Sequence, residues 1–282
     1  MGADKGKTVV GFIGLGVMGH SMAGHILAGG YDLLVYNRSR DKATELVARG
    51  ARWKDDIPSL AAESDVVITI VGYPKDVEEV YLGAKGLVAN ARPGTVLVDM
   101  TTSSPALAVR IAGAAAERGI SALDAPVSGG DRGAREGTLS IMVGGEKEAY
   151  EQVLPIFHLL GQNVVLQGGP GCGQHTKMAN QIVIASNMMG VCEALAYAKG
   201  AGLDPEQVLS SISGGAAGSW SLSNLGPRIL AGNFAPGFYV KHFIKDMSAL
   251  RRRAAGTTAP RPCTSSTTAR DAYRSGRAEG EK

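Results

Sequence analysis

Three glycines that follow a short apolar run near the start of the chain constrain its fold more than any other feature. Residues 9–19 read VVGFIGLGVMG, which places Gly14, Gly16 and Gly19 at G-x-G-x-x-G spacing. The first glycine permits a turn too tight for a β-carbon, the second lets backbone approach a phosphate, and the third lets a helix pack close to the strand. An ordinary glycine turn shows the same spacing, but the strand pattern before it and the helix pattern after it favour a dinucleotide site. The predicted cofactor-binding loop comprises Gly14, Leu15, Gly16, Val17, Met18 and Gly19.

Short β-branched runs alternate with Ala-rich helical segments up to about residue 168. Several runs are continuously apolar, as in strands that helices cover on both faces, and the segments between them are long enough for right-handed crossovers. The alternation predicts an α/β fold with a Rossmann-type doubly wound sheet, with partly antiparallel pairing among the last three strands. The expected strands lie within residues 8–14, 32–37, 65–71, 95–100, 120–126, 139–145 and 163–168.

The strand pattern does not recur after residue 174. Residues 174–202 read as one helix of nearly 30 residues, closed by two glycines, and we expect this helix to bridge two domains. A second helix is expected from Asp204 and Pro205, a capping residue followed by proline at the first helical position. The remainder of this domain is expected to be helical.

Residues 251–282 differ in composition from the rest of the chain, because they contain no Val, Ile, Leu, Met, Phe or Trp. Such a segment buries too little apolar area to offset its ordering entropy, so we expect it to be disordered. The expected organisation is a Rossmann domain at 1–168, an incomplete helical substrate or dimerisation domain at 169–250, and an atypical tail at 251–282. The tail carries a local charge of +5, which leaves −2 for residues 1–250 and no electrostatic case for nucleic-acid binding.

Cysteine and apolar patterns indicate the compartment. The three cysteines show neither disulfide nor metal-ligand spacing, which suits a reducing environment, and the five histidines form no zinc-type cluster. No apolar run approaches the ~20 residues that span a bilayer. We therefore expect a cytoplasmic protein without a metal site or a membrane segment.

Cofactor choice is decided where the second predicted strand ends. A dinucleotide fold usually places an acidic residue there to bind the adenosine ribose. Here the sequence reads Asn37, Arg38 and Ser39, which can hydrogen-bond a 2′-phosphate that an acid would repel. This favours NADP over NAD, although NAD stays possible, and the alternative is that Arg38 is a solvated loop residue.

A glycine-rich turn follows the strand expected at 120–126. Ser128, Gly129 and Gly130 offer exposed amides and a hydroxyl that suit a small carboxylate. A turn without any ligand explains the same residues equally well.

Polar residues share one face at the start of the long helix. Gln174, Lys177, Asn180 and Gln181 stand at i−3, i, i+3 and i+4, and the residues beyond them are mostly apolar. A lysine in that setting is partly desolvated, which lowers its pKa and lets it act as an acid or base near neutral pH. The alternative is an ordinary surface lysine at a helix start.

Four segments in this order resemble the β-hydroxyacid dehydrogenase family: GFIGLGVMG, DAPVSGG with GTLSIMVGG behind it, GQHTKMANQ, and FYVKHFIKD. The resemblance covers residues 8–250 and implies a Rossmann domain, an all-helical second domain on a long interdomain helix, and a homo-oligomer where the helical domain is complete. It implies reduction or oxidation of a small β-hydroxy acid or its semialdehyde.

The same resemblance implies roles for individual residues. Lys177 would be the catalytic acid or base and Asn180 its polar helper, while Ser128, Gly129 and Gly130 would hold the substrate carboxylate. Val71 and Thr102 would lie by the nicotinamide, and Lys245 on the cofactor side. The remaining substrate residues would be Gln181, Phe238 and Asp246.

Two departures from the family pattern bear on function. The helix motif usually ends in two asparagines, whereas Asn180 and Gln181 stand here, as in the tartronate semialdehyde reductase branch. The tail at 251–282 replaces further helices and resembles a change of reading frame or a foreign end. The alternative function is therefore a non-catalytic NADP-binding module or an inactive truncated member, against which the presence of Lys177 and Asn180 argues.

Overall fold

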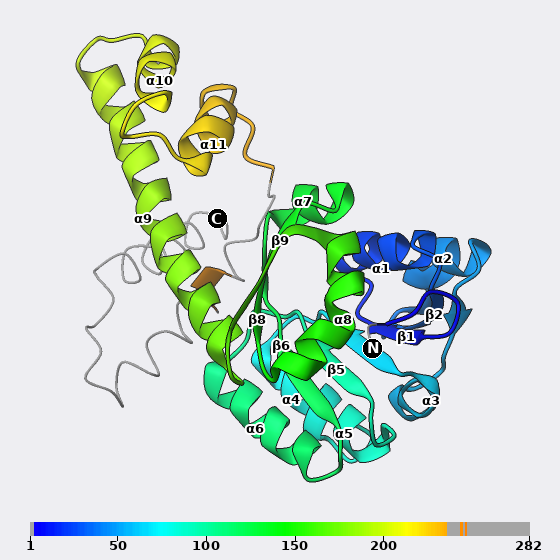
Figure 1. The fold of residues 1–282 in the computed structure, drawn as a ribbon. Coiled ribbons are helices and arrows are strands. Elements are labelled where there is room, and N and C mark those ends of the chain that lie inside the picture. Colours follow the sequence, from blue (N-terminus) through cyan, green and yellow to red (C-terminus); the bar gives the residue numbers. More distant parts are fainter. Residues whose placement is uncertain (1–2, 236–242, 245, 247–282) are drawn as a thin grey trace, which may run out of the picture. The chain divides into compact units, whose positions relative to one another are not determined.

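The computed structural model describes residues 3–235, 243, 244 and 246, and its contacts divide the chain into two compact units, residues 1–177 and 178–282. The expected tail at 251–282 lies outside the described residues. The first unit contains a sheet in which nine strands are described, with helices on both faces (Figure 1). The strands are β1 (Val9–Ile13), β2 (Asp32–Tyr36), β3 (Arg52–Trp53), β4 (Val66–Thr69), β5 (Val96–Asp99), β6 (Ser121–Asp124), β7 (Val127–Ser128), β8 (Leu139–Gly144) and β9 (Gly161–Gly168).

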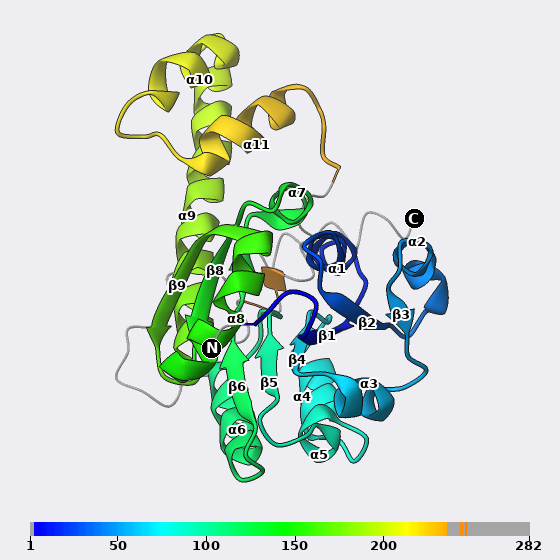
Figure 2. The ribbon, with the colours of Figure 1, turned by 45° about the vertical axis from the view of Figure 1, so that its right-hand side comes forward.

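The sheet confirms the predicted doubly wound topology. Its order is β3-β2-β1-β4-β5-β6-β8-β7, with β9 paired to β8, and the first six strands run parallel (Figure 2). The chain reverses its direction of winding between β1 and β4, which is where open α/β sheets bind ligands. The expected antiparallel pairing occurs between β6 and β8, whereas β8 and β9 pair in parallel.

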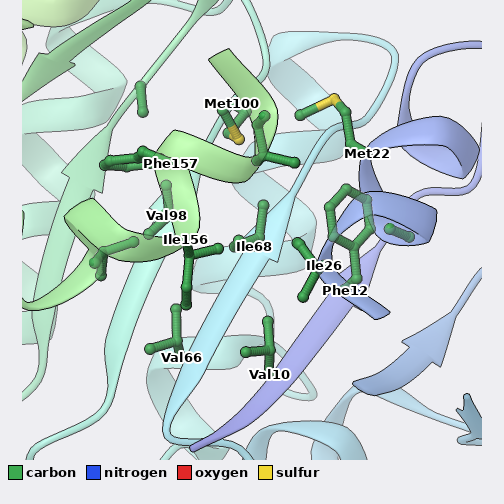
Figure 3. Close-up of a cluster of buried hydrophobic side chains, with 14 of the residues drawn as sticks. Val10, Phe12, Met22, Ile26, Val66, Ile68, Val98, Met100, Ile156 and Phe157 are labelled. Atoms are coloured by element: carbon green, nitrogen blue, oxygen red, sulfur yellow. The ribbon is translucent and has the colours of Figure 1, made fainter. Parts of the chain in front are cut away.

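The two faces of the sheet carry separate apolar cores. Phe12 on β1, Ile26 and Phe157 belong to the core on one face, where the covering helices include α1 (Gly19–Ala28) and α8 (Lys147–Leu160) (Figure 3). Val67 and Tyr81 belong to the core on the opposite face. The other elements of this unit are the 3-10 helix η1 (Arg40–Ala43), α2 (Thr44–Ala48), α3 (Ile57–Glu63), α4 (Pro74–Leu82), α5 (Leu87–Asn90), α6 (Pro105–Ala116) and α7 (Gly130–Glu136).

The long predicted helix is present as α9 (Cys172–Gly200), whose 29 residues begin in the first unit and continue in the second. The second unit also contains α10 (Pro205–Ser213) and α11 (Trp220–Leu230). Asp204 caps α10 as predicted, since its carboxylate accepts a bond from Glu206 N at 2.9 Å. A small core that includes Val191, Leu209 and Leu222 joins these three helices.

Contrary to the expectation that no apolar segment reaches this length, α9 is, among the described residues, long and apolar enough to cross a membrane by length and composition. A core helix of a soluble protein meets the same criterion, so this property alone assigns no membrane role.

Candidate active site

The glycine turn after β1 has the geometry that its spacing predicts. Gly14 has φ of +99°, and a β-carbon there would collide with the backbone carbonyl of Ile70. A β-carbon on Gly19 would collide with the carbonyl oxygen of Gly14, so a larger residue would push α1 away from the turn. At Gly16 a β-carbon would have no neighbour within 4 Å among the residues that the structure describes, which leaves open space beside the backbone. The turn therefore offers a cradle that a side chain would fill.

The helix that starts at this turn keeps its N-terminus available. Among the described residues, no side chain caps α1, and its first turn contains no acidic residue. The first amides of a helix lack intrahelical partners, and with the helix dipole they form an anion site. Val17, in the turn before α1, is exposed, whereas Leu15 is buried in the core. Only the backbone of Leu15 is therefore presented on the outer side of the turn.

The residues after β2 hold the turn and present a positive charge. The carboxamide oxygen of Asn37 accepts a bond from Leu15 N at 3.0 Å, and its Nδ2 donates to the carbonyl of Ser39 at 2.9 Å. Asn37 therefore fixes the loop from the second strand. The guanidinium of Arg38 is exposed and lies 3.8 Å from a carboxylate oxygen of Asp76, the third residue of α4.

A buried polar network fixes the loops at the ends of β4 and β5. Asp99 accepts bonds from Thr69 Oγ1 at 3.1 Å and from Thr101 N at 3.0 Å, and the hydroxyl of Thr69 lies 2.9 Å from that of Tyr81. Thr101 Oγ1 in turn accepts from Val71 N at 2.9 Å. Burial raises the pKa of Asp99 to about 6, although these donors act in the opposite direction. The network thus links two of the segments that were predicted to flank the nicotinamide.

The turn after β7 depends on glycine. Gly129 and Gly130 have φ of +130° and +62°, a region that side chains disfavour. Ser128 pairs with Ser140 across β7 and β8, and α7 begins at Gly130. The three predicted carboxylate-binding residues thus form one continuous turn in the first unit.

Lys177 is buried in the second turn of α9. Its exposed fraction is 6%, so the alternative of a surface lysine is wrong. Gln174, one turn earlier, is fully buried, with its amide bonded to Thr101 O at 2.7 Å and Ser103 N at 2.8 Å. Asp124, at the end of β6, accepts from Gly171 N and Gln174 N, both at 2.7 Å. The start of this helix is thereby bonded to the ends of β5 and β6.

The second unit contains further residues that the sequence assigned to substrate. Gln181 Nε2 donates to Asp246 Oδ2 at 2.6 Å, and both side chains are buried. Asn180 Nδ2 donates to Gln181 Oε1 at 2.9 Å, so these three residues form one hydrogen-bonded group. Phe238 and Lys245 lie outside the described residues.

Sequence reasoning assigned no role to three acidic residues. Asp99 and Asp124 each close a buried strand, and an acid directly after an apolar run was the available signal. Their partners could not be read from the sequence, because Asp124 meets residues 47 and 50 positions later. The approach of Asp76 to Arg38 likewise depends on how α4 packs in the fold.

A parallel sheet with a glycine turn at its switch point and a buried lysine in the same unit defines the class of dinucleotide-binding oxidoreductases. The family model for the NAD binding domain of 6-phosphogluconate dehydrogenase matches residues 9–169. The model for the NAD-binding domain of NADP-dependent 3-hydroxyisobutyrate dehydrogenase matches residues 171–282. The chain belongs to the β-hydroxyacid dehydrogenase family and is an NAD(P)-dependent oxidoreductase, as the sequence resemblance predicted.

Individual relatives agree with this assignment. The uncharacterized oxidoreductase YkwC of Bacillus subtilis is 64% identical over 241 residues, which cover 86% of this chain and 84% of the relative. The 2-hydroxy-3-oxopropionate reductase of Escherichia coli is 43% identical over 239 residues, covering 85% and 82% of the two chains. The Mycobacterium tuberculosis 3-hydroxyisobutyrate dehydrogenase, solved with L-serine, superposes with a TM-score of 0.85 at 29% identity, covering 96% of this chain and 94% of that one.

Proposed function

We propose that the enzyme interconverts a small β-hydroxy acid and its semialdehyde with NADP(H), and that Lys177 is the acid or base of this reaction. The observation that carries the proposal is the burial of Lys177 on a helix whose start is bonded to the ends of β5 and β6. The names of the relatives, a 2-hydroxy-3-oxopropionate reductase and a 3-hydroxyisobutyrate dehydrogenase, support this class of substrate.

The residues present fit a dinucleotide. The turn from Gly14 to Gly19 would hold the pyrophosphate, because its glycines leave a cradle and the N-terminus of α1 favours an anion. Arg38 would hold a 2′-phosphate, and Val71 and Thr102 would flank the nicotinamide, which supplies or accepts the hydride when bound. NADP is favoured over NAD by Arg38 and by the NADP-dependent family model that matches the chain.

Lys177 would exchange a proton with the substrate oxygen at its Nζ atom. In the reducing direction the ammonium donates this proton as the carbonyl becomes an alcohol, and in the oxidising direction the amine removes it. Its burial excludes water, which strengthens charge interactions at the reacting oxygen. We assign Ser128, Gly129 and Gly130 to the substrate carboxylate, as the family resemblance implies. Asn180 is assigned as the polar helper of Lys177, and Gln181 and Asp246 to substrate binding.

The test of this function is Lys177→Ala. We expect kcat to fall by several powers of ten, because proton transfer and charge stabilisation each contribute roughly 10²-fold or more. The Kd for NADPH should stay within about threefold of the original, since the lysine is assigned to substrate. Lys199→Ala is the matched control, because Lys199 is an exposed residue of the same helix.

Stopped-flow absorbance of NADPH measures turnover, and fluorescence titration measures cofactor affinity. Glyoxylate and the succinic, methylmalonic and tartronic semialdehydes form the substrate panel. A Lys177→Ala enzyme that turns over within about threefold of the original, where chemistry limits the rate, contradicts the acid-base role.

A further inference from the structure

The start of α9 is packed against the ends of β6 and β8 with no room for a side chain. A β-carbon on Gly173 would collide with the carbonyl oxygens of Met142 and Asp124. A β-carbon on Gly144 would stand 2.6 Å from both Gly173 N and an Asp124 carboxylate oxygen. Backbone therefore meets backbone at this junction, and small displacements of the helix are sterically blocked in this direction.

Asp124 supplies a directional anchor at the junction. Its two carboxylate oxygens accept separate bonds, Oδ1 from Gly171 N and Oδ2 from Gln174 N, each at 2.7 Å. Two bonds to different atoms of the helix start fix its rotation as well as its position. The side chain is 4% exposed, so water does not compete for these bonds.

Gln174 supplies a second anchor on another strand end. Its Nε2 donates to Thr101 O at 2.7 Å and its Oε1 accepts from Ser103 N at 2.8 Å, so its amide is bonded to both neighbours of Thr102. Thr101 is itself bonded through Oγ1 to Val71 N. One glutamine side chain thus ties the helix that carries Lys177 to both segments assigned to the nicotinamide.

A contribution to folding stability does not by itself account for the burial of the Asp124 carboxylate. Desolvation raises its pKa to about 6 despite the amide donors, so burial of the charge works against folding. Helix starts elsewhere in this chain are capped without burial: Asp56 caps α3 at the surface through a bond from Ser59 N at 2.8 Å.

We propose that Asp124 and Gln174 are positioning residues that act through Lys177, by holding its helix in register with the loops that carry Val71 and Thr102. This inference rests on the proposed role of Lys177. The two side chains set where the proton donor stands relative to the nicotinamide-side loops, and neither exchanges a proton with the substrate.

The test is a double-mutant cycle. Asp124→Asn and Gln174→Met are made in the original enzyme and in the Lys177→Ala enzyme, with Asp56→Asn as the control for loss of a capping carboxylate. In the original enzyme we expect each variant to lower kcat about 10- to 100-fold while the NADPH Kd stays within about threefold. In the Lys177→Ala enzyme, followed by single-turnover NADPH oxidation, the same changes should cost less than about threefold.

Amide hydrogen exchange gives a readout that does not depend on activity. Exchange across residues 171–177 should rise at least tenfold in Asp124→Asn and stay unchanged in Asp56→Asn. Gln174→Met keeps the proposal testable where Asp124→Asn fails to fold, because it replaces an uncharged side chain by one of similar volume.

The outcomes separate the two proposals. Equal losses in both backgrounds, or a kcat within threefold in the original enzyme, overturn the positioning role while Lys177 keeps its own. An unchanged kcat in Lys177→Ala overturns the acid-base role and, with it, the route through which Asp124 and Gln174 act.

Discussion

The two helices that begin at the ligand edge of the first unit, α1 and α9, use their N-termini in opposite ways. Among the described residues, no side chain caps α1, and its first turn holds no acid. The start of α9 is instead filled by the buried carboxylate of Asp124. Both ends carry the same partial positive charge. The difference teaches that one feature, a helix N-terminus, can stay open to an outside anion, as at α1 (the open end), or be occupied by the protein's own carboxylate, as at α9 (the filled end).

The largest expected effect concerns the filled end. Gly173→Ala should lower the free energy of unfolding by about 2–4 kcal/mol, because its β-carbon would strike two backbone carbonyls that cannot rotate away. Gly190→Ala is the matched control in the same helix, where a β-carbon has no described neighbour within 4 Å and alanine should stabilise by about 0.5–1 kcal/mol. Urea unfolding measures both, and equal stabilities would show that the junction is not tightly packed.

The charge at the filled end gives a pH dependence of known sign. The pKa of Asp124 is about 6 in the folded protein, above its unfolded value, so the folded state binds more protons between about pH 4 and 6. The contribution of this group to stability is therefore present at low pH and is lost as the pH rises through 6. Compared with Asp124→Asn, the original protein should lose on the order of 2 kcal/mol of stability between pH 4 and 7.

The contribution of Asp56 to stability should depend on pH with the opposite sign to that of Asp124. Its bonds from Ser59 lower its pKa, so its contribution is present at neutral pH and is lost as the pH falls through the folded pKa. The Asp124→Asn curve should therefore diverge from the original between about pH 4 and 7, whereas the Asp56→Asn curve should stay nearly parallel to the original down to about pH 5 and diverge with the opposite sign below about pH 4. An Asp124→Asn curve that runs parallel to the original from about pH 4 to 7 would contradict the burial of an ionised Asp124.

At the open end, we expect a substitution to weaken NADPH binding without lowering the stability of the fold. Gly16→Ala places its methyl group in open space, so the melting temperature should stay within about 2 °C. The same methyl group would occupy the space assigned to the pyrophosphate, and we expect the NADPH Kd to rise at least about tenfold, or ~1.4 kcal/mol. Fluorescence titration measures this, and an unchanged Kd would place the phosphates elsewhere.

The smallest expected effect concerns the charge beside the open end. Arg38 faces Asp76 at 3.8 Å, and because the guanidinium is exposed while the carboxylate is largely buried, we take the pair to be worth about 0–1 kcal/mol. We expect NADPH to bind about tenfold more tightly than NADH, and Asp76→Asn to widen that ratio by roughly threefold because the competing carboxylate is removed. Arg38→Asp should reverse the order. Equal Kd values for the two cofactors in the original enzyme would remove Arg38 from the cofactor site.

Local sequence patterns predicted the open end at α1. The filled end at α9 was not predicted, because its contacts join residues far apart in the sequence. The turn with Gly14 and Gly19 was readable because strand, turn and helix follow each other within 20 residues. The seven longer strands were readable from local patterns as well, and so was α9, which was expected at residues 174–202 and lies at Cys172–Gly200. The two-residue strands β3 and β7 were missed, because two residues show no periodicity.

The anchors of α9 could not be found in this way. Lys177 and Gln174 were placed correctly on one helix face, yet the bonds of Gln174 reach 71 and 73 residues back. Asp124 lies in the same segment as Ser128 and the two glycines, and sequence reasoning assigned roles to those three residues but none to Asp124. Its importance follows from the sheet, where Asp124 and Asp99 are register partners on adjacent strands.

The hydrogen-bonded residues at the N-termini of α1 and α9 are separated by different distances in the sequence. This difference sets the order in which the two ends form as the chain folds. The bond from Leu15 to Asn37 spans 22 residues and needs only the first two strands, which leave the ribosome first. The junction at Asp124 waits until β6, β8 and the start of α9 have all been synthesised, and contacts of such long range form slowly. A growing chain therefore completes the turn from Gly14 to Gly19 well before Lys177 is in place, so the proposed acid or base is among the last residues of the first unit to be positioned.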